Sequence, residues 1–301
     1  MRIHGIVNRR AGTLIGTDPD AFAQRLNAAY TAAGHALTLD VVEPEEMSDR
    51  LDAAAKQSYD ALLIGGGDGS INAAASRLLG SKTALGILPL GTMNRLAREL
   101  QLSLGLDRIV AELAHSEPVK IDVAEVNGRI FLCNSFIGLP PMITERRQRL
   151  RGRGFRERMV GYIRLPLDIS RNMRRLSLFI DDEKSPRAIR ALTVAVSNNA
   201  YAEEPSLIPK RVSLDQGWLG LYISRHYTFW QTIWVMLRAA LGLWHGDPRF
   251  ERHKLRKLTI GSKRSQLRVS NDGELMRLDT PLRYSIRPKA LTVLVPVRDV
   301  A

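Results

Sequence analysis

Short apolar segments alternate with amphipathic segments along the first third of the chain, and this alternation limits the possible folds more than any other feature. The strand-like segments are residues 3–7, 37–42, 61–64 and 84–88. The segments with helical spacing are residues 19–33, 45–56, 71–79 and 92–100. This alternation is typical of βαβ units and a parallel sheet. Right-handed crossovers then place the loops after the strands at one sheet edge.

The pattern changes near Pro118, after which β-rich segments predominate. They are residues 119–126, 130–136, 176–180, 192–197, 219–224, 258–260, 266–269, 282–286 and 291–295. Asn127-Gly128 is typical of a tight hairpin turn between two of them. This part predicts an antiparallel sandwich or barrel with helical insertions at residues 144–175 and 226–245. We place the domain boundary near residue 120.

Composition limits the partners and the compartment. The 301 residues include 44 Lys and Arg against 31 Asp and Glu, and the net charge of +13 favours anionic partners such as a nucleotide, a nucleic acid or an anionic lipid surface. Cys133 is the only cysteine, so no disulfide framework is expected. The N-terminal segment lacks a signal-peptide core, and no run reaches the ~20 apolar residues of a membrane-spanning helix. We expect a cytoplasmic protein with peripheral membrane contact.

The strongest local motif is a glycine-rich loop between a strand and a helix. It reads Gly65-Gly66-Gly67-Asp68-Gly69-Ser70. Glycines let the backbone approach a phosphate, and the following helix presents unpaired N–H groups and the positive end of its dipole. Asp68 can hold Mg²⁺ through water, and Ser70 can donate its hydroxyl. The alternative is a structural turn in which Asp68 or Ser70 only caps the helix.

A second loop has the same context on the same predicted sheet edge. It reads Gly86-Ile87-Leu88-Pro89-Leu90-Gly91-Thr92-Met93-Asn94. Thr92 could cap the helix or touch a phosphate, and Asn94 could reach the base, the ribose or a phosphate. Asn8 ends the first strand, and a short loop leads from it to Gly12. Loops of this kind at one edge predict a nucleotide cleft.

Together these motifs resemble the bacterial diacylglycerol kinase family, whose catalytic domain is shared with sphingosine and ceramide kinases. The NPxSG, GGDGT and GTxND segments of that family correspond here to NRRAG, GGDGS and GTMNR. Further segments are similar in the same order: Ile121-Asp122-Val123, Leu214-Asp215-Gln216-Gly217-Trp218-Leu219, Asn271-Asp272-Gly273-Glu274 and residues 288–296. The resemblance covers nearly the whole chain.

The resemblance implies both a fold and an activity. It implies an N-terminal parallel α/β nucleotide domain, residues 1–120 plus 288–301, related to NAD kinases and phosphofructokinases. A C-terminal antiparallel β-sandwich domain, residues 121–287, would receive the lipid substrate. The implied reaction is ATP- and Mg²⁺-dependent transfer of the γ-phosphate to the hydroxyl of a membrane lipid. Diacylglycerol is the default acceptor, with sphingoid bases, ceramide or another lipid alcohol as alternatives.

Residue roles follow from the same resemblance. The nucleotide would be bound by the loops through Asn8, Gly66, Gly67, Asp68, Gly69, Ser70, Gly91, Thr92 and Asn94. Asp68 and Asp122 would hold the catalytic Mg²⁺ through water. Glu274 would be the general base, with Asp272 as its close partner, because a lipid hydroxyl needs a proton acceptor to attack the γ-phosphorus. Without the resemblance, residues 271–273 would read only as a turn.

Two positions depart from the family pattern. Arg95 stands where the family usually has Asp, so the aspartate–water–metal network is incomplete or rebuilt here. Gln216 stands where the family has an Asp ligand of an accessory Mg²⁺ site. A neutral Gln is a weaker ligand than a carboxylate, so we do not expect that site to be filled.

Two basic segments are candidates for a membrane surface. Residues 144–175 contain eleven arginines and three acidic residues, and residues 249–268 contain eight Lys and Arg and one Glu. Such clusters suit anionic lipid headgroups, although a solvated basic face is the alternative. Residues 226–245 place three tryptophans at helical spacing, which fits either a core helix or an interfacial one. No recognition motif for nucleic acid accompanies the charge, and an oligomer is compatible with the sequence.

Two other functions compete with the lipid kinase. An NAD kinase shares the GGDG motif, but the Leu214–Leu219 segment and the terminal strand are lipid-kinase-like. A catalytically inactive protein that binds a lipid or a nucleotide is the second rival. The intact glycine-rich loop and the acidic segment at residues 272–274 argue against it.

Overall fold

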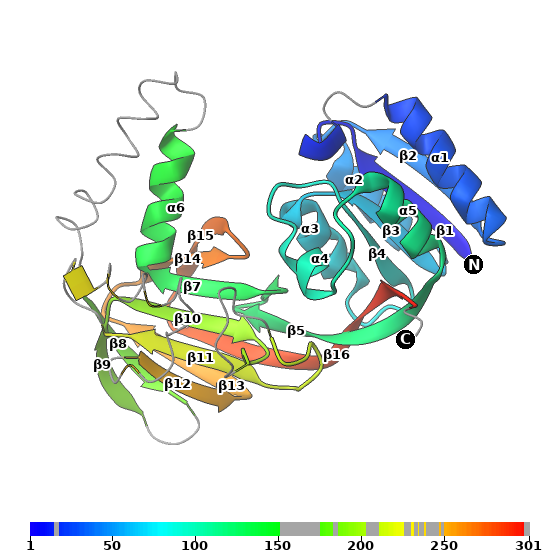
Figure 1. The fold of residues 1–301 in the computed structure, drawn as a ribbon. Helices are drawn as coiled ribbons and strands as arrows, with labels where there is room; N and C mark the ends of the chain where they lie inside the picture. The colour runs from blue at the N-terminus through cyan, green and yellow to red at the C-terminus, as the bar shows by residue number, and fades with distance from the viewer. Residues whose placement is uncertain are drawn as a thin grey trace. The chain divides into compact units, whose positions relative to one another are not determined.

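The chain forms two compact units in the structure, which is a computed structural model. Unit 1 comprises Met1–Val123 and Pro288–Ala301, and unit 2 comprises Ala124–Arg287. β5 (Ser116–Val126) and β16 (Leu282–Pro296) have residues in both units (Figure 1). The structure describes residues 1–14, 18–150, 175–182, 186–202, 211–225, 230, 231, 234, 238, 247 and 250–297.

Unit 1 is built on a parallel sheet in which β2-β1-β3-β4 are followed by the C-terminal part of β16. Its first four strands are β1 (Arg2–Asn8), β2 (Ala36–Val42), β3 (Ala61–Gly66) and β4 (Ala84–Pro89). Its helices are the 3₁₀ turn η1 (Gly12–Leu14), α1 (Pro19–Ala32), α2 (Met47–Ala55), α3 (Asp68–Leu78), α4 (Arg95–Glu99) and α5 (Leu106–Ala114). The predicted parallel α/β fold is confirmed.

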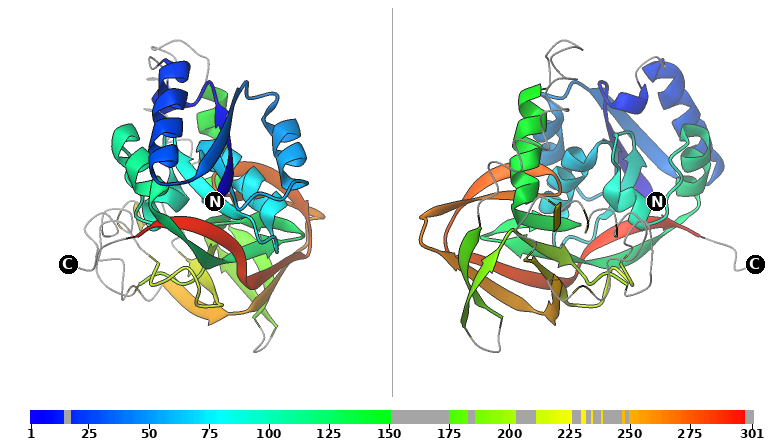
Figure 2. Two further views of the ribbon diagram at one scale, coloured as in Figure 1. Left: turned by 90° about the vertical axis from the view of Figure 1, so that its right-hand side faces the viewer. Right: turned by 60° about the vertical axis from the view of Figure 1, so that its left-hand side comes forward.

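Helices cover both faces of this sheet. α1 packs with α5, and α2 packs with α3 on the other side of the strands (Figure 2). β3 and β4 are therefore buried along their whole length, and their sequences are almost continuously apolar rather than alternating. α3 turns Ile71, Ala74 and Leu78 inward, which follows the spacing of an amphipathic helix.

Unit 2 is an antiparallel β-sandwich, as the sequence predicts. One sheet has the order β12-β11-β10-β7-β14-β15, and the other joins β9, β8 and β13 to the N-terminal part of β16, with β6 beside β5. Its own elements are β6 (Arg129–Phe131), β7 (Asn134–Gly138), α6 (Leu139–Leu150), β8 (Leu176–Asp181), β9 (Arg187–Ala191), β10 (Thr193–Asn198), β11 (Leu219–Ser224), β12 (Phe250–Leu255), β13 (Lys257–Ser262), β14 (Gln266–Asn271) and β15 (Glu274–Asp279). Apolar residues of both sheets, such as Val196 and Ile260, form one core.

Several predicted boundaries change. The predicted strand 130–136 is two strands, β6 and β7, because the backbone N–H groups between them bond to a side chain instead of a strand. The predicted helix 92–100 begins only at Arg95, since Asn94 adopts left-handed dihedral angles. The hairpin turn at Asn127-Gly128 is confirmed, with positive φ at both residues. β9, β12 and β15 were not predicted, because charged residues interrupt their apolar pattern.

The predicted helical insertions lie largely outside the described residues. α6 begins the first of them at Leu139, five residues before the predicted start at residue 144. Residues 151–174, with most of the arginine-rich cluster, and most of residues 226–245 are not described. Of the tryptophans in the second insertion, Trp230 and Trp234 are described and exposed. None of the helices in the described part combines the length and the apolar character that a membrane crossing needs.

Candidate functional site

The first loop of the candidate site joins β3 to α3. β3 ends at Gly66, and α3 begins at Asp68 with Gly67 as its N-cap residue in an extended conformation. Among the described residues, no side chain caps this helix, so the alternative in which Asp68 or Ser70 only caps it is wrong. A Cβ on Gly66 would lie 2.7 Å from Oγ of Ser70, which shows that the Ser70 side chain lies over the loop. The first turn of α3 therefore offers backbone N–H groups to an anion.

The second loop, between β4 and α4, is held by the side chain of Asn94. This side chain is buried, and its Oδ1 accepts the Gly91 N–H at 2.9 Å. Its Nδ2 donates to the carbonyl oxygens of Pro89 at 2.9 Å and Gly91 at 2.7 Å. Both amide hydrogens are used within the loop, so Asn94 shapes the turn. Contact of Asn94 with a nucleotide stays a prediction, as does that of Thr92, which is exposed in the same loop.

The loops meet at the C-terminal edge of the parallel strands. The Leu90 N–H donates to the Gly66 carbonyl at 3.1 Å. A Cβ on Gly91 would lie 2.5 Å from Cα of Gly67, so only glycine fits there. The loop after β1 also reaches this point, because a Cβ on Gly12 would lie 3.9 Å from the Leu90 carbonyl oxygen. The predicted loops thus come together as one backbone-lined site.

Asn8 forms the start of the loop after β1. Its Oδ1 accepts the Arg10 N–H at 2.9 Å, and its carbonyl accepts the Ala11 N–H at 3.1 Å. These bonds close a tight turn of the type that Asn favours. A direct role of Asn8 in nucleotide binding stays a prediction.

Asp68 links the two glycine-containing loops. Its Oδ1 accepts the backbone N–H of Arg95, the first residue of α4, at 2.7 Å. The bond uses the backbone of residue 95, so the carboxylate of Asp68 is held whichever side chain stands there. Within the described part of the chain, no protein group pairs with Oδ2 of Asp68.

The donor set fits a magnesium ion held mainly by phosphates. Mg²⁺ is usually bound by one or two carboxylates together with substrate phosphates and waters, not by a cage of protein ligands. Asp68 offers one carboxylate oxygen beside a backbone-lined anion site. Across the residues that the structure describes, no group of three or more His, Cys, Asp or Glu is arranged to hold a metal by itself.

Asp122 is fully buried, and its carboxylate accepts a hydrogen bond from the backbone of β16. Its Oδ1 accepts the N–H of Lys289 at 2.8 Å, and Lys289 has a positive φ of 51°. The next residue, Ala290, accepts the N–H of Gly80, which follows the end of α3. The contacts therefore tie Asp122 to the end of the helix that Asp68 begins. A Mg²⁺ ion shared by Asp68 and Asp122 stays a prediction.

Asp272 occupies a hairpin in unit 2 and is nearly buried. Asp272 and Gly273 both have positive φ and connect β14 to β15 through a two-residue turn. The carboxylate accepts three backbone N–H groups, from Leu132 at 2.6 Å, Cys133 at 2.9 Å and Asn134 at 2.8 Å. Successive N–H groups of this kind form an anion-binding nest. Asp272 is therefore a clamp between two segments of unit 2, and the reading of residues 271–273 as only a turn is incomplete.

Glu274 is the first residue of β15 and pairs with Asn271 across the hairpin. Its side chain is exposed overall. Partial burial of its carboxyl, and then the charge of Asp272, raise the pKa of Glu274 above its ordinary value. A carboxylate with a raised pKa is a better proton acceptor. The two carboxylates therefore differ: the oxygens of Asp272 are engaged by three backbone N–H groups, and Glu274 is the stronger candidate base.

The turn around Gln216 is local. The Ser213 hydroxyl bonds to the Asp215 carboxylate, and the Asp215 N–H donates to the Ser213 hydroxyl at 3.3 Å. Gly217 has a positive φ of 73°. The accessory metal role of Gln216 stays a prediction that the neutral side chain disfavours.

Arg211 is a buried residue that the sequence did not single out. Its Nη1 donates to the carbonyl oxygens of Leu132 at 2.8 Å and Asn198 at 2.6 Å. The same segment, Leu132–Cys133, donates its N–H groups to Asp272. Arg211 and Asp272 therefore hold one backbone segment by its carbonyl and amide groups. No local motif marks this arrangement, because it depends on residues far apart in the sequence.

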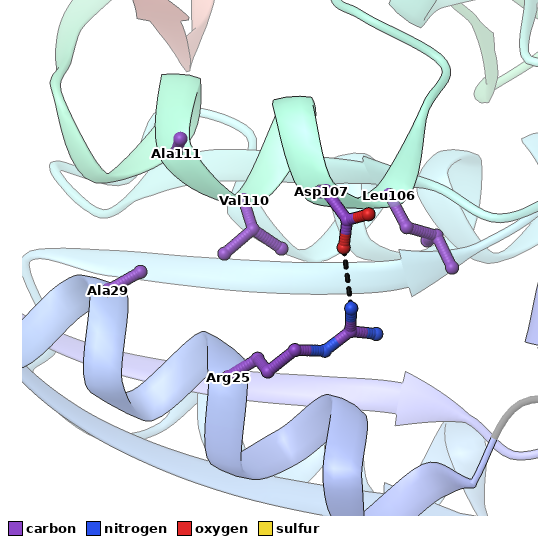
Figure 3. A pocket seen from close by; sticks show the side chains of 6 residues that line it. All are labelled: Arg25, Ala29, Leu106, Asp107, Val110 and Ala111. Atoms are coloured by element: carbon purple, nitrogen blue, oxygen red, sulfur yellow. Dashed lines mark hydrogen bonds and ion pairs between the residues drawn. The ribbon is translucent and has the colours of Figure 1, made fainter.

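A small hollow lies elsewhere on unit 1, between α1 and α5 (Figure 3). Its lining residues are Arg25, Ala29, Leu106, Asp107, Val110 and Ala111. Arg25 and Asp107 form an ion pair at 2.5 Å across it. None of the predicted site residues lines this hollow.

A parallel α/β unit with glycine-rich loops at its strand ends, followed by an antiparallel sandwich, is the architecture of the phosphotransferase class that includes lipid and NAD kinases. The sequence pattern of the diacylglycerol kinase catalytic domain matches residues 2–126. That of the YegS C-terminal NAD kinase beta sandwich-like domain matches residues 159–295. The chain belongs to the bacterial diacylglycerol kinase family of lipid kinases.

Individual relatives support this assignment. The chain is 33% identical over 119 residues to a protein named "Probable lipid kinase YegS-like" of Yersinia enterocolitica, a match that covers 37% of this chain and 40% of that protein. It is 23% identical over 267 residues to a diacylglycerol kinase of Staphylococcus saprophyticus. That match covers 86% of this chain and 83% of the Staphylococcus protein. The match to the Yersinia relative thus spans less than half of that protein.

Solved structures share the fold. A crystal structure of a diacylglycerol kinase from Bacillus anthracis has a TM-score of 0.70 and 18% identity, and covers 100% of this chain and 98% of that chain. A second structure from that organism has a TM-score of 0.76 at 20% identity, with the same coverage. At this identity the likeness establishes the fold alone.

Proposed function

We propose that the protein transfers the γ-phosphoryl group of ATP, with Mg²⁺, to the hydroxyl of a membrane lipid, with diacylglycerol as the first candidate. The observation that carries the proposal is the junction of the two glycine loops. There, a side chain at Gly91 would collide with the backbone of Gly67, and Asp68 is fixed by the Arg95 N–H at 2.7 Å. A backbone-lined site at the start of α3 suits the phosphates of a nucleotide.

In the proposed reaction, each residue has a limited task. Bound Mg²⁺ would neutralise charge on the β- and γ-phosphates, and Asp68 is the residue that would hold it. Glu274 accepts the proton of the lipid hydroxyl as the hydroxyl oxygen attacks the γ-phosphorus. The bond between the γ-phosphorus and its bridging oxygen breaks, and ADP leaves with the electron pair. The raised pKa of Glu274 favours this proton transfer.

Asp272 supports the base and does not replace it. Its carboxylate oxygens accept three backbone N–H groups, so they are already engaged within unit 2. Its negative charge raises the pKa of Glu274. Its task in the proposed reaction is therefore to hold the hairpin and to tune the base.

Different observations support the proposed lipid acceptor and the proposed membrane surface. The Staphylococcus relative is a diacylglycerol kinase by name, which favours that acceptor. The net charge of +13 favours an anionic membrane surface, to which we propose the protein binds peripherally.

NAD kinase is the second candidate function. The observation in its favour is that the matched sandwich domain is described as NAD kinase-like. Parallel assays with labelled ATP and either diacylglycerol micelles or NAD separate the two. We expect label in the lipid and none in NAD. Label that appears only in NAD would identify the protein as an NAD kinase instead.

A further inference from the structure

The arginines of unit 1 differ in how their guanidinium groups are satisfied. Residues 1–123 contain nine arginines, all of them within the described residues. Eight have a guanidinium partner: Arg2 lies over the Tyr59 ring, Arg9 and Arg10 pair with Glu43, Arg25 with Asp107, Arg50 with Asp40, Arg77 with Asp52, Arg98 with the Met93 carbonyl, and Arg108 with Glu112. Among these residues, the Arg95 guanidinium alone has no acidic, carbonyl or aromatic partner.

Arg95 lies at the candidate site itself. It is the first residue of α4, it is half-buried, and its backbone N–H is bonded to Asp68 at 2.7 Å. Its guanidinium does not pair with that carboxylate, although the backbone of the same residue does. Partial burial makes an unpaired charge less favourable than a paired one. Within the part of the chain that the structure describes, the Arg95 guanidinium is thus an uncompensated cation beside the loops.

We infer that Arg95 binds the terminal phosphates of the nucleotide through its guanidinium group, an inference that rests on the proposed function. A planar guanidinium matches the oxygens of a phosphate in a two-point contact, and charge-assisted bonds of this kind are among the strongest in proteins. The anchoring of the Arg95 backbone by Asp68 fixes the base of the side chain at the loop junction. A phosphate would then supply the partner that the Arg95 guanidinium lacks among the described residues.

The neighbouring arginines are poorer candidates for this task. Arg98 is exposed on the same helix, and its Nε already donates to the Met93 carbonyl at 2.9 Å. Arg10 is bonded to Glu43 at 2.9 Å, and Arg9 lies 3.7 Å from the same carboxylate. Arg98 therefore serves as a matched control, with the same charge on the same short helix but with its guanidinium engaged.

The test measures nucleotide affinity by titration calorimetry on the full chain in Mg²⁺ buffer. Arg95→Met removes the charge and keeps an apolar stem, Arg95→Lys keeps the charge, and Arg98→Met is the control. Arg95→Met should weaken ATP binding about tenfold or more, the usual scale for losing a charge-assisted bond. Its affinity for AMP, which lacks the terminal phosphates, should not change. Arg95→Lys should recover part of the loss, and Arg98→Met should bind ATP as the wild type does.

Other outcomes would overturn the inference. They are an unchanged ATP affinity in Arg95→Met, an equal loss for ATP and AMP, or an equal loss in Arg98→Met. Binding to vesicles of anionic phosphatidylglycerol tests whether Arg95 contacts the phosphate of a lipid headgroup. Weakened vesicle binding with unchanged ATP affinity would assign Arg95 to a lipid headgroup instead. A wild-type protein that binds no ATP would remove the proposed function together with this inference, whereas intact wild-type binding isolates Arg95.

Discussion

Two carboxylates only two residues apart have different surroundings and different chemistry. Asp272 accepts three backbone N–H groups and is nearly buried, whereas Glu274 lies on the exposed start of β15. Partial burial, and then the charge of Asp272, raise the pKa of Glu274. One residue therefore serves the fold and the other is suited to proton transfer. Substitutions should separate the two roles.

Glu274→Gln should lower the turnover of lipid by about 10²- to 10⁴-fold, the usual contribution of a general base. In the wild type, turnover should rise with pH through the raised pKa of Glu274, because the base must be ionised. The Gln variant should lose this acid limb of the pH–rate profile. Asp279→Asn, at the exposed far end of β15, is the control and should keep the profile. An acid limb that persists in Glu274→Gln would assign the base elsewhere.

Glu274→Gln should not lower the stability of the protein, although it should lower turnover. A carboxyl whose pKa is raised on folding binds protons more readily in the folded state, so its ionisation lowers stability as pH rises through the window between the unfolded and folded pKa values. Gln avoids this loss above that window. The free energy of unfolding in urea should therefore stay within about 0.5 kcal/mol of the wild type or increase slightly. A large destabilisation would mean that lost activity reflects unfolding.

Asp272→Asn should act mainly on stability. Asn tolerates the positive φ of 46° but replaces one acceptor oxygen by a donor that faces backbone N–H groups. Leaving a buried donor unsatisfied costs about 1–3 kcal/mol, so a loss of roughly 2 kcal/mol in the free energy of unfolding is expected. Urea denaturation provides the measurement. A variant as stable as the wild type would contradict the clamp role.

At the scale of elements, the site depends on how closely two loops approach. Gly91→Ala would place a Cβ 2.5 Å from Cα of Gly67 and 2.9 Å from Oδ1 of Asn94. The loops must then separate, so ATP affinity should fall by about tenfold or more. Gly105→Ala is the control, because its Cβ would meet nothing within 4 Å and the helix that it precedes lies outside the loop junction. Equal ATP affinities in the two variants would show that loop contact does not shape the site.

The same loops show what sequence reasoning could and could not reach. Buried strands followed by glycines predicted where the loops lie, since period and turn chemistry are local signals. The task of Asn94 was not predictable, because its three hydrogen bonds appear only once the turn is folded. The start of α4 at Arg95, and not at the predicted residue 92, also depends on the folded turn. The clamp of Asp272 on Leu132–Asn134 joins positions about 140 residues apart, and no local pattern reports such a contact.

At the scale of the whole molecule, the change from alternating strands and helices to β-rich sequence was enough to predict both folds. β9, β12 and β15 escaped prediction because edge strands carry charged residues, as in Phe250–Leu255. The net charge is also a property of the whole chain, and it predicts behaviour at a membrane.

Binding to vesicles should depend on charge and salt. We expect the protein to sediment with vesicles rich in anionic lipid and to remain largely unbound with neutral ones, since basic residues near such a surface each contribute about 1 kcal/mol. Raising the ionic strength should release it, because salt screens exposed charges. Co-sedimentation at two salt concentrations measures this. Equal binding to neutral and anionic vesicles would contradict an electrostatic attachment.

We propose above all that the protein moves a phosphoryl group from ATP to a lipid hydroxyl at the Asp68 loop. Incubation with ATP labelled at the γ-phosphate, Mg²⁺ and separate micelles of diacylglycerol, a sphingoid base and ceramide tests it most directly, with Asp68→Ala in parallel. We expect labelled lipid, foremost from diacylglycerol, and a rate of labelling lower by orders of magnitude in the folded Asp68→Ala variant. A folded wild-type protein that binds ATP but labels none of these lipids, or a fully active Asp68→Ala variant, would contradict it.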